Sequence, residues 1–155
     1  AEPRYHNLLA PYFQLTNEEL ISWTTAPYEH NITYPEHLTH HSISGNTVRS
    51  KSEAIIDMTL YTNQIPFRYE AQLMLNDIPV FPDFTILHPR TKEIYYWEHF
   101  GMMDNEKYAK SACSKISLYT SNNIIPSINL ITTFETKDHP LSTILVDNII
   151  QHYFL

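Results

Sequence analysis

Two carboxylic acids lie in stretches of the sequence that are otherwise apolar. Asp83 lies in the run 81–87 and Glu98 in the run 94–101, and both runs are rich in aromatic and β-branched residues. An ionised acid is costly to bury unless it is paired or binds a cation. Carboxylate oxygens are the ligands that Mg²⁺ and Mn²⁺ prefer, so the two acids predict a divalent metal site.

The segment between the two runs has the composition of a turn. Residues 88–93 contain Pro89 and three charged side chains, which predicts a β-hairpin built from 81–87 and 94–101. Asp83 and Glu98 would then lie on adjacent strands.

A longer ordered set of residues resembles the PD-(D/E)xK nuclease superfamily, in particular a bacterial or phage branch of it. The set comprises Val48–Glu53, Phe67–Glu70, Pro82–Phe84, Trp97–Gly101, Lys115 and Tyr119, and it covers roughly residues 48–155. The resemblance implies an α/β (α+β) fold with the restriction-endonuclease-like αβββαβα core, in which helices flank a mixed sheet. We expect 48–155 to form this nuclease-like domain.

The resemblance also implies roles for individual residues. Asp83, Glu98 and Glu53 would hold Mg²⁺ or Mn²⁺, together with the backbone carbonyl of His99. The expected reaction is hydrolysis of phosphodiester bonds in nucleic acid, with DNA as the expected substrate. The alternative is a catalytically inactive module that binds nucleic acid or a protein partner.

The third motif departs from the family pattern, because Phe100 occupies the position of the lysine. A phenyl ring neither donates a proton nor carries charge. Either the lysine has moved, with Lys115 the first candidate and Lys51 the second, or His99 takes over part of its role, or the site is inactive. Strand alternation opposes His99, since adjacent side chains point to opposite faces.

Two helices are expected to present site residues. Helix 50–61 begins with Ser50 and Glu53 at the spacing of a capping box, which is the alternative, purely structural role for Glu53. A helix capped by Asp104 and running to about residue 119 would place four residues on one face. These are Tyr108, Ala112, Lys115 and Tyr119, so Tyr108 and Tyr119 are secondary site candidates.

Strands and a last helix complete the predicted core. Alternation predicts a strand over 67–75, with Glu70 on its polar face, either in the site or paired with Arg68. The turn Asn76-Asp77 would lead to the Pro-Asp strand. A strand over 128–134 should lie parallel to the strand before the long helix. A helix over 141–153 follows, with Pro140 in its first turn.

The apolar residues within 1–47 follow no clear helical or strand period. This predicts a loop-rich segment that packs on the core or links to a missing domain. A short helix over 17–23, capped by Thr16 or Asn17, is expected within it. The motif His37-Leu38-Thr39-His40-His41 would place two imidazoles on one face if it were helical, which leaves a zinc site as a weaker alternative.

The composition is that of a globular domain with one cysteine, Cys113. The net charge of −7 argues against a protein that coats nucleic acid indiscriminately. No run reaches the ~18 apolar residues of a membrane span, so we expect a cytoplasmic protein without a membrane partner. The first residue is Ala1, so a longer chain with an additional N-terminal domain is left open, as is a homodimer.

Overall fold

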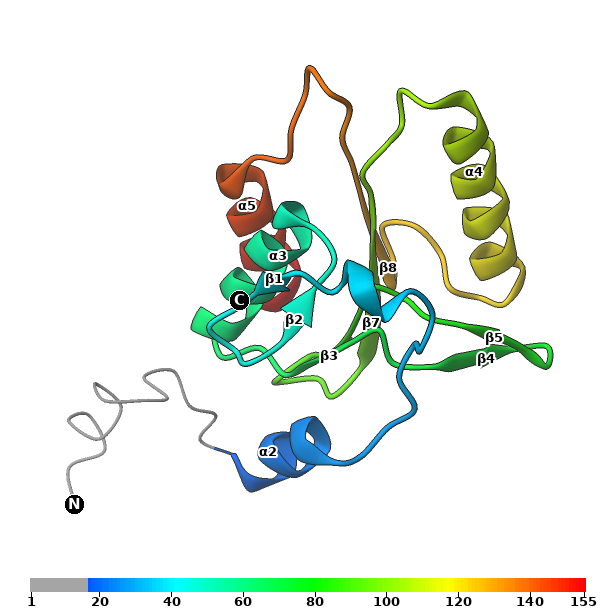
Figure 1. Cartoon of the computed structure of the whole chain (residues 1–155). Helices are drawn as coiled ribbons and strands as arrows, with labels where there is room; N and C mark the ends of the chain where they lie inside the picture. Colours follow the sequence, from blue (N-terminus) through cyan, green and yellow to red (C-terminus); the bar gives the residue numbers. More distant parts are fainter. Residues whose placement is uncertain (1–16) are drawn as a thin grey trace.

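The structure is a computed structural model that describes residues 17–155 (Figure 1). Its elements in chain order are α2 (Glu18–Thr25), the 3₁₀ helix η1 (Pro35–His37), β1 (His40–His41), β2 (Thr47–Val48), α3 (Lys51–Thr62), β3 (Phe67–Tyr69), β4 (Leu73–Leu75), β5 (Ile78–Val80), β6 (Phe84–Leu87), β7 (Ile94–Phe100), α4 (Glu106–Ser121), β8 (Leu130–Phe134) and α5 (Thr143–Phe154). The fold is mixed α+β, as predicted.

The central sheet has the strand order β3-β6-β7-β8. Strands β6 and β7 form the predicted antiparallel hairpin, and β8 returns parallel to β7 after α4. Helices α3 and α5 pack together on one side of the sheet and α4 lies on the other (Figure 1). From α3 onward the central elements therefore follow the predicted order αβββαβα, with the hairpin β4–β5 inserted after β3.

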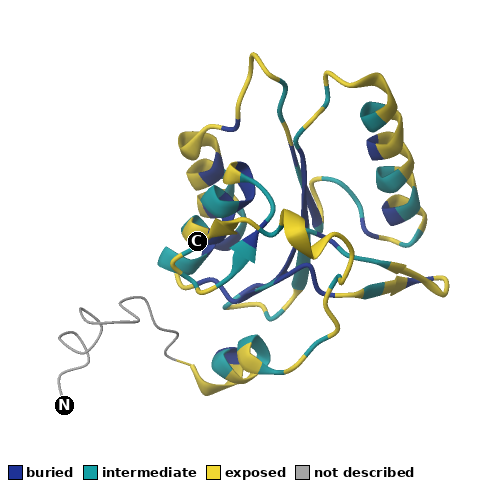
Figure 2. Cartoon of the chain, viewed as in Figure 1, coloured by how far each residue is buried: buried dark blue, intermediate teal, exposed yellow. Residues whose placement is uncertain are grey.

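Alternation along β7 divides its side chains between the two faces of the sheet. Trp97 and Tyr95 pack in the apolar core that includes α3 and α5, whereas Tyr96 packs in a smaller cluster with Tyr119 of α4. Figure 2 shows the strands of the central sheet largely buried between the helices, whose outer faces are exposed. Because successive side chains point to opposite faces, Glu98 shares the α4 side with Tyr96.

The single strand predicted for 67–75 is wrong, because the chain bends within it. Glu70 has a φ of 50°, a left-handed conformation that ends β3. The chain then enters the hairpin β4–β5, whose turn residues Asn76 and Asp77 also have positive φ, at 49° and 65°. Two such residues suit the tight turn of a two-residue hairpin. Asn76-Asp77 therefore joins β4 to β5 and does not lead directly into the Pro-Asp strand.

Four predicted helix starts can be compared with the structure. Ser50 caps α3 as predicted, and Asn17 caps α2. The cap of α4 is Asn105 and not Asp104, because the Asn105 side chain accepts a hydrogen bond from the Tyr108 N–H at 2.9 Å. Helix α5 is capped by Ser142, so Pro140 precedes it and is not in its first turn.

The described part of the N-terminal segment packs on the core. The Arg68 guanidinium lies 4.0 Å from the centroid of the Trp23 ring in α2 and donates to the Trp23 carbonyl at 2.8 Å. Tyr28 donates through its hydroxyl to the Tyr69 carbonyl. Residues 1–16 of the predicted segment lie outside the described residues. Within 17–155, no helix is both long and apolar enough to cross a membrane.

Candidate active site

A pocket of about 270 Å³ opens where β6 begins and β7 ends, and residues of α3 and α4 also line it. It is lined by Glu53, Asp83, Glu98, His99, Phe100, Tyr108, Ser111, Ala112 and Lys115. The structure thus brings together the three predicted acids and the predicted helix lysine, although they come from four separate segments of the chain.

The two central acids are neighbours across the hairpin. Phe84 pairs with Trp97, and the same register, one residue further, places Asp83 opposite Glu98. The backbone N–H of His99 donates to Asp83 Oδ2 at 2.8 Å. Since the N–H and C=O of one strand residue point to the same side, the His99 carbonyl faces the same edge as Asp83.

Helix α4 supplies two partners to Glu98. Lys115 Nζ lies 3.0 Å from Glu98 Oε2, and the Tyr119 hydroxyl donates to Oε1 at 2.9 Å. Lys115 and Tyr119 are one helical turn apart, which confirms the predicted shared face. Tyr108, one turn before Ala112, lines the pocket and accepts a hydrogen bond from the Gly101 N–H at 3.1 Å.

Glu53 has both a capping contact and a place in the pocket. Its backbone N–H donates to Ser50 Oγ at 3.1 Å, as in a capping box. Its carboxylate reaches back to the N–H of Arg49 (3.1 Å), one residue before the cap, and accepts a hydrogen bond from the Tyr69 hydroxyl at 2.5 Å. The two roles that the sequence left open are therefore compatible.

Burial disfavours the ionised form of each acid in the pocket. Burial, reinforced by the negative charges of Glu98 and Glu53, raises the pKa of Asp83 well above its ordinary value. Burial also raises the pKa values of Glu98 and Glu53. Burial opposes the charged form of Lys115, but attraction to Glu98 and Asp83 outweighs it and raises the pKa of the ammonium group. Lys115 is therefore a cation at neutral pH.

The His99 ring lies on the opposite face of β7 from Glu98, as alternation predicts. Its Nδ1 lies 2.8 Å from Thr133 Oγ1 and its Nε2 2.6 Å from Glu135 Oε1. Ser52, in the first turn of α3, donates to the same Glu135 oxygen. Sequence reasoning missed Glu135, although an acid directly after a predicted core strand was a usable signal.

Two predicted candidates, Lys51 and Glu70, are not among the residues that line the pocket. Lys51 lines a separate cavity beside His41. Glu70 pairs with the Arg49 guanidinium, with Oε2 2.6 Å from Nε, so its predicted pairing with Arg68 is wrong. Phe100, which does line the pocket, is buried and stacks on Phe134, with ring centroids 5.4 Å apart.

The histidine motif does not form the predicted arrangement. His37 lies in η1, whereas His40 and His41 form the short strand β1, so the helical spacing considered for zinc is absent. Among residues 17–155, no group of three or more His, Cys, Asp and Glu side chains is arranged to hold a metal ion.

The chemistry of the pocket's donors nevertheless fits a hard divalent cation. Asp83, Glu98, Glu53 and the His99 carbonyl offer oxygen ligands, which Mg²⁺ and Mn²⁺ prefer. Burial raises the pKa values of the three acids, so the folded protein disfavours their ionised forms. A bound cation would favour the ionised forms.

Comparisons with known proteins give little further information. No protein-family model and no solved structure match the chain. A segment of 69 residues, 44% of this chain, is 38% identical to an uncharacterised protein of Methanocaldococcus jannaschii. The match spans 6% of that protein's length, and its description assigns no activity.

Proposed function

We propose that this chain is a metal-dependent nuclease of the PD-(D/E)xK type that hydrolyses phosphodiester bonds in DNA. The observation that carries the proposal is the meeting of Glu53, Asp83, Glu98 and Lys115 in one pocket, from four segments of the chain. The order of strands and helices around the pocket is the order that the family resemblance implied.

Each residue has a definite part in the proposed reaction. Asp83, Glu98 and Glu53, with the His99 carbonyl, would hold Mg²⁺ or Mn²⁺. Such a cation supplies an activated water and neutralises charge on the phosphoryl oxygens when it is bound. Lys115 contributes positive charge beside Glu98 and orients its carboxylate, because its ammonium group stays protonated at neutral pH. The lysine of the family motif is thus replaced from helix α4.

The test is cleavage of single- and double-stranded DNA with Mg²⁺ or Mn²⁺. We expect wild type to cut, Asp83→Asn to lose at least about 100-fold in rate, and Lys115→Ala to lose about 100-fold, since removing one charge-stabilising group typically costs ~10²–10³. Lys110→Ala is the matched control, because Lys110 lies on the same helix but pairs with Glu106 on the surface. Cleavage that persists in Asp83→Asn, or that needs no divalent metal, would refute the proposal.

One observation favours the alternative of an inactive binding module. Both oxygens of Glu98 are already hydrogen-bonded, by Lys115 and Tyr119, so this carboxylate is satisfied without a metal. Isothermal titration calorimetry with Mn²⁺ distinguishes the nuclease from the inactive binding module. An inactive module predicts the same heat for wild type and Asp83→Asn, whereas the nuclease predicts binding that Asp83→Asn weakens.

A further inference from the structure

An exposed aromatic pair, Tyr34 and His37, lies on a segment that Arg49 connects to the candidate active site, and the backbone of Tyr34 has an unusual conformation. Tyr34 has φ 48° and ψ 55°, in the left-handed region, although it is bulky and precedes Pro35. Its residue is 65% exposed. The ring stacks on His37, with centroids 5.2 Å apart and planes 9° from parallel. Such backbone strain persists only where neighbouring groups maintain it, and it is frequent at ligand sites.

Arg49 is the group that maintains the conformation. Its guanidinium donates to the carbonyl oxygens of Thr33 at 2.7 Å and Tyr34 at 2.8 Å. The same guanidinium is fixed by Glu70 through two hydrogen bonds, at 2.6 and 3.1 Å. A planar guanidinium with several donors suits this task. Hydrogen bonds from Arg49 therefore fix the backbone carbonyls of Thr33 and Tyr34, while the exposed Tyr34 ring faces outward.

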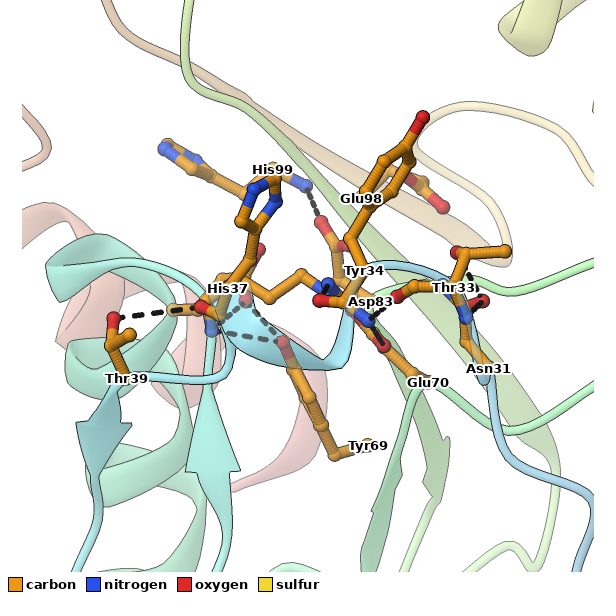
Figure 3. Close-up of polar contacts among 12 residues, drawn as sticks. Asn31, Thr33, Tyr34, His37, Thr39, Tyr69, Glu70, Asp83, Glu98 and His99 are labelled. Carbon is orange, nitrogen blue, oxygen red and sulfur yellow. Dashed lines mark hydrogen bonds and ion pairs between the residues drawn. The ribbon is translucent and has the colours of Figure 1, made fainter.

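The same arginine connects the pair to the pocket. The Arg49 N–H donates to Glu53, which lines the pocket. In the view of Figure 3 the labelled Tyr34 and His37 overlap the region of Asp83 and Glu98. In this series of contacts Arg49 alone separates Tyr34 from the pocket acid Glu53.

We propose that the Tyr34–His37 pair stacks an unpaired nucleobase of the DNA strand whose phosphate enters the pocket. This inference rests on the proposed nuclease function and adds the substrate class, which is single-stranded or locally opened DNA. Flat aromatic rings stack on any base. The protein has a net charge of −7, so attraction to phosphates contributes little and stacking becomes the larger source of affinity.

The test measures binding separately from cleavage. The probe is a short oligodeoxythymidylate that carries one 2-aminopurine, titrated with protein in Ca²⁺, a hard divalent cation that coordinates more loosely than Mg²⁺. Wild type should quench the 2-aminopurine fluorescence. Tyr34→Ala should weaken binding by about 5- to 100-fold and lose the quenching, because base–aromatic stacking contributes that much per base. Tyr34→Phe should bind as wild type, since the ring remains.

Ile32→Ala is the matched control, because Ile32 is an exposed apolar neighbour on the same loop, at 85% exposure. It should bind as wild type. Equal binding and quenching by wild type and Tyr34→Ala would overturn the stacking site and leave the nuclease proposal intact. Cleavage by wild type of fully paired DNA alone would have the same two consequences. Failure of wild type to bind or cut any DNA would refute the proposed function, and the stacking site with it.

Discussion

Phe100 shows at the level of one residue why the motif lysine is absent from β7. The side chain is 3% exposed and its ring stacks on Phe134. An ammonium group at this position would be buried among aromatic rings, at high cost. Lys115 instead approaches Glu98 from helix α4 and remains partly open to solvent, with 37% of its side chain exposed. The charge is thus placed where it can stay hydrated.

Restoring the lysine to the strand should therefore harm the protein. We expect Phe100→Lys to lower the free energy of unfolding by at least about 3 kcal/mol, the scale on which deletion of a buried Phe ring destabilises a core. We also expect that adding it to Lys115→Ala does not recover cleavage. Urea unfolding and the DNA cleavage assay measure the two effects. Phe100→Leu, which keeps the position apolar, should cost less, and recovered cleavage in the double variant would contradict this account.

At the level of elements, Glu135 connects two segments that carry the site, β7 and α3, with the segment before α5. It lies just after β8, contacts His99 of β7 and Ser52 of α3, and accepts a hydrogen bond from the Leu141 N–H before α5. Ser52 adjoins Glu53, and His99 holds Asp83 through its N–H. Glu135 therefore positions two site acids without lining the pocket itself.

Glu135→Ala should loosen this connection. We expect a loss of stability of about 1–3 kcal/mol at pH 7, because buried partners lose a charged acceptor. Burial opposes ionisation of Glu135, but donors from Ser52 and His99 outweigh it and lower its pKa. The stabilisation should therefore be complete above the unfolded Glu pKa of about 4.3 and be lost as pH falls through the lowered folded pKa.

Urea unfolding at several pH values, together with Mn²⁺ titration, measures the consequences of Glu135→Ala. We expect weaker Mn²⁺ binding, because Glu53 and His99 lose a shared support. Asp138→Ala is the control, since Asp138 is exposed in the same loop. Unchanged stability and unchanged Mn²⁺ affinity in Glu135→Ala would show that the connection is dispensable.

The elements differ in how far the sequence could predict them. The hairpin β6–β7, helix α3 and the face of α4 that carries Lys115 follow from local patterns, because apolar alternation, the Ser50 cap and helical spacing act within a few residues. The break at Glu70 and the connection through Glu135 were not predicted. Both depend on partners distant in sequence: Arg49 fixes Glu70 across 21 positions, and Ser52 meets Glu135 across 83.

For the whole molecule, the buried acids of the site lower the free energy of unfolding, and a bound cation would reduce this loss. Glu53, Asp83 and Glu98 all have raised pKa values, first because of burial. The folded state therefore holds protons to a higher pH than the unfolded chain, whose Asp and Glu titrate near ~3.9 and ~4.3. Stability falls with rising pH wherever the folded state binds more protons. We expect wild type in EDTA to lose stability from about pH 4 upward, until the raised pKa values are passed.

Asp83→Asn should reduce this loss, because it removes one buried charge and its repulsion of the other two acids. Each unit of pKa difference corresponds to about 1.4 kcal/mol, so in EDTA the variant should exceed wild type in stability at pH 7 and match it more closely near pH 4. Urea unfolding across this range measures the difference. Asp77→Asn, at an exposed position in the β4–β5 turn, should follow wild type. Mg²⁺ should raise the stability of wild type and leave that of Asp83→Asn almost unchanged, because an ion stabilises the folded state only when it binds to that state. A larger stabilisation of Asp83→Asn than of wild type by Mg²⁺ would exclude Asp83 as a metal ligand.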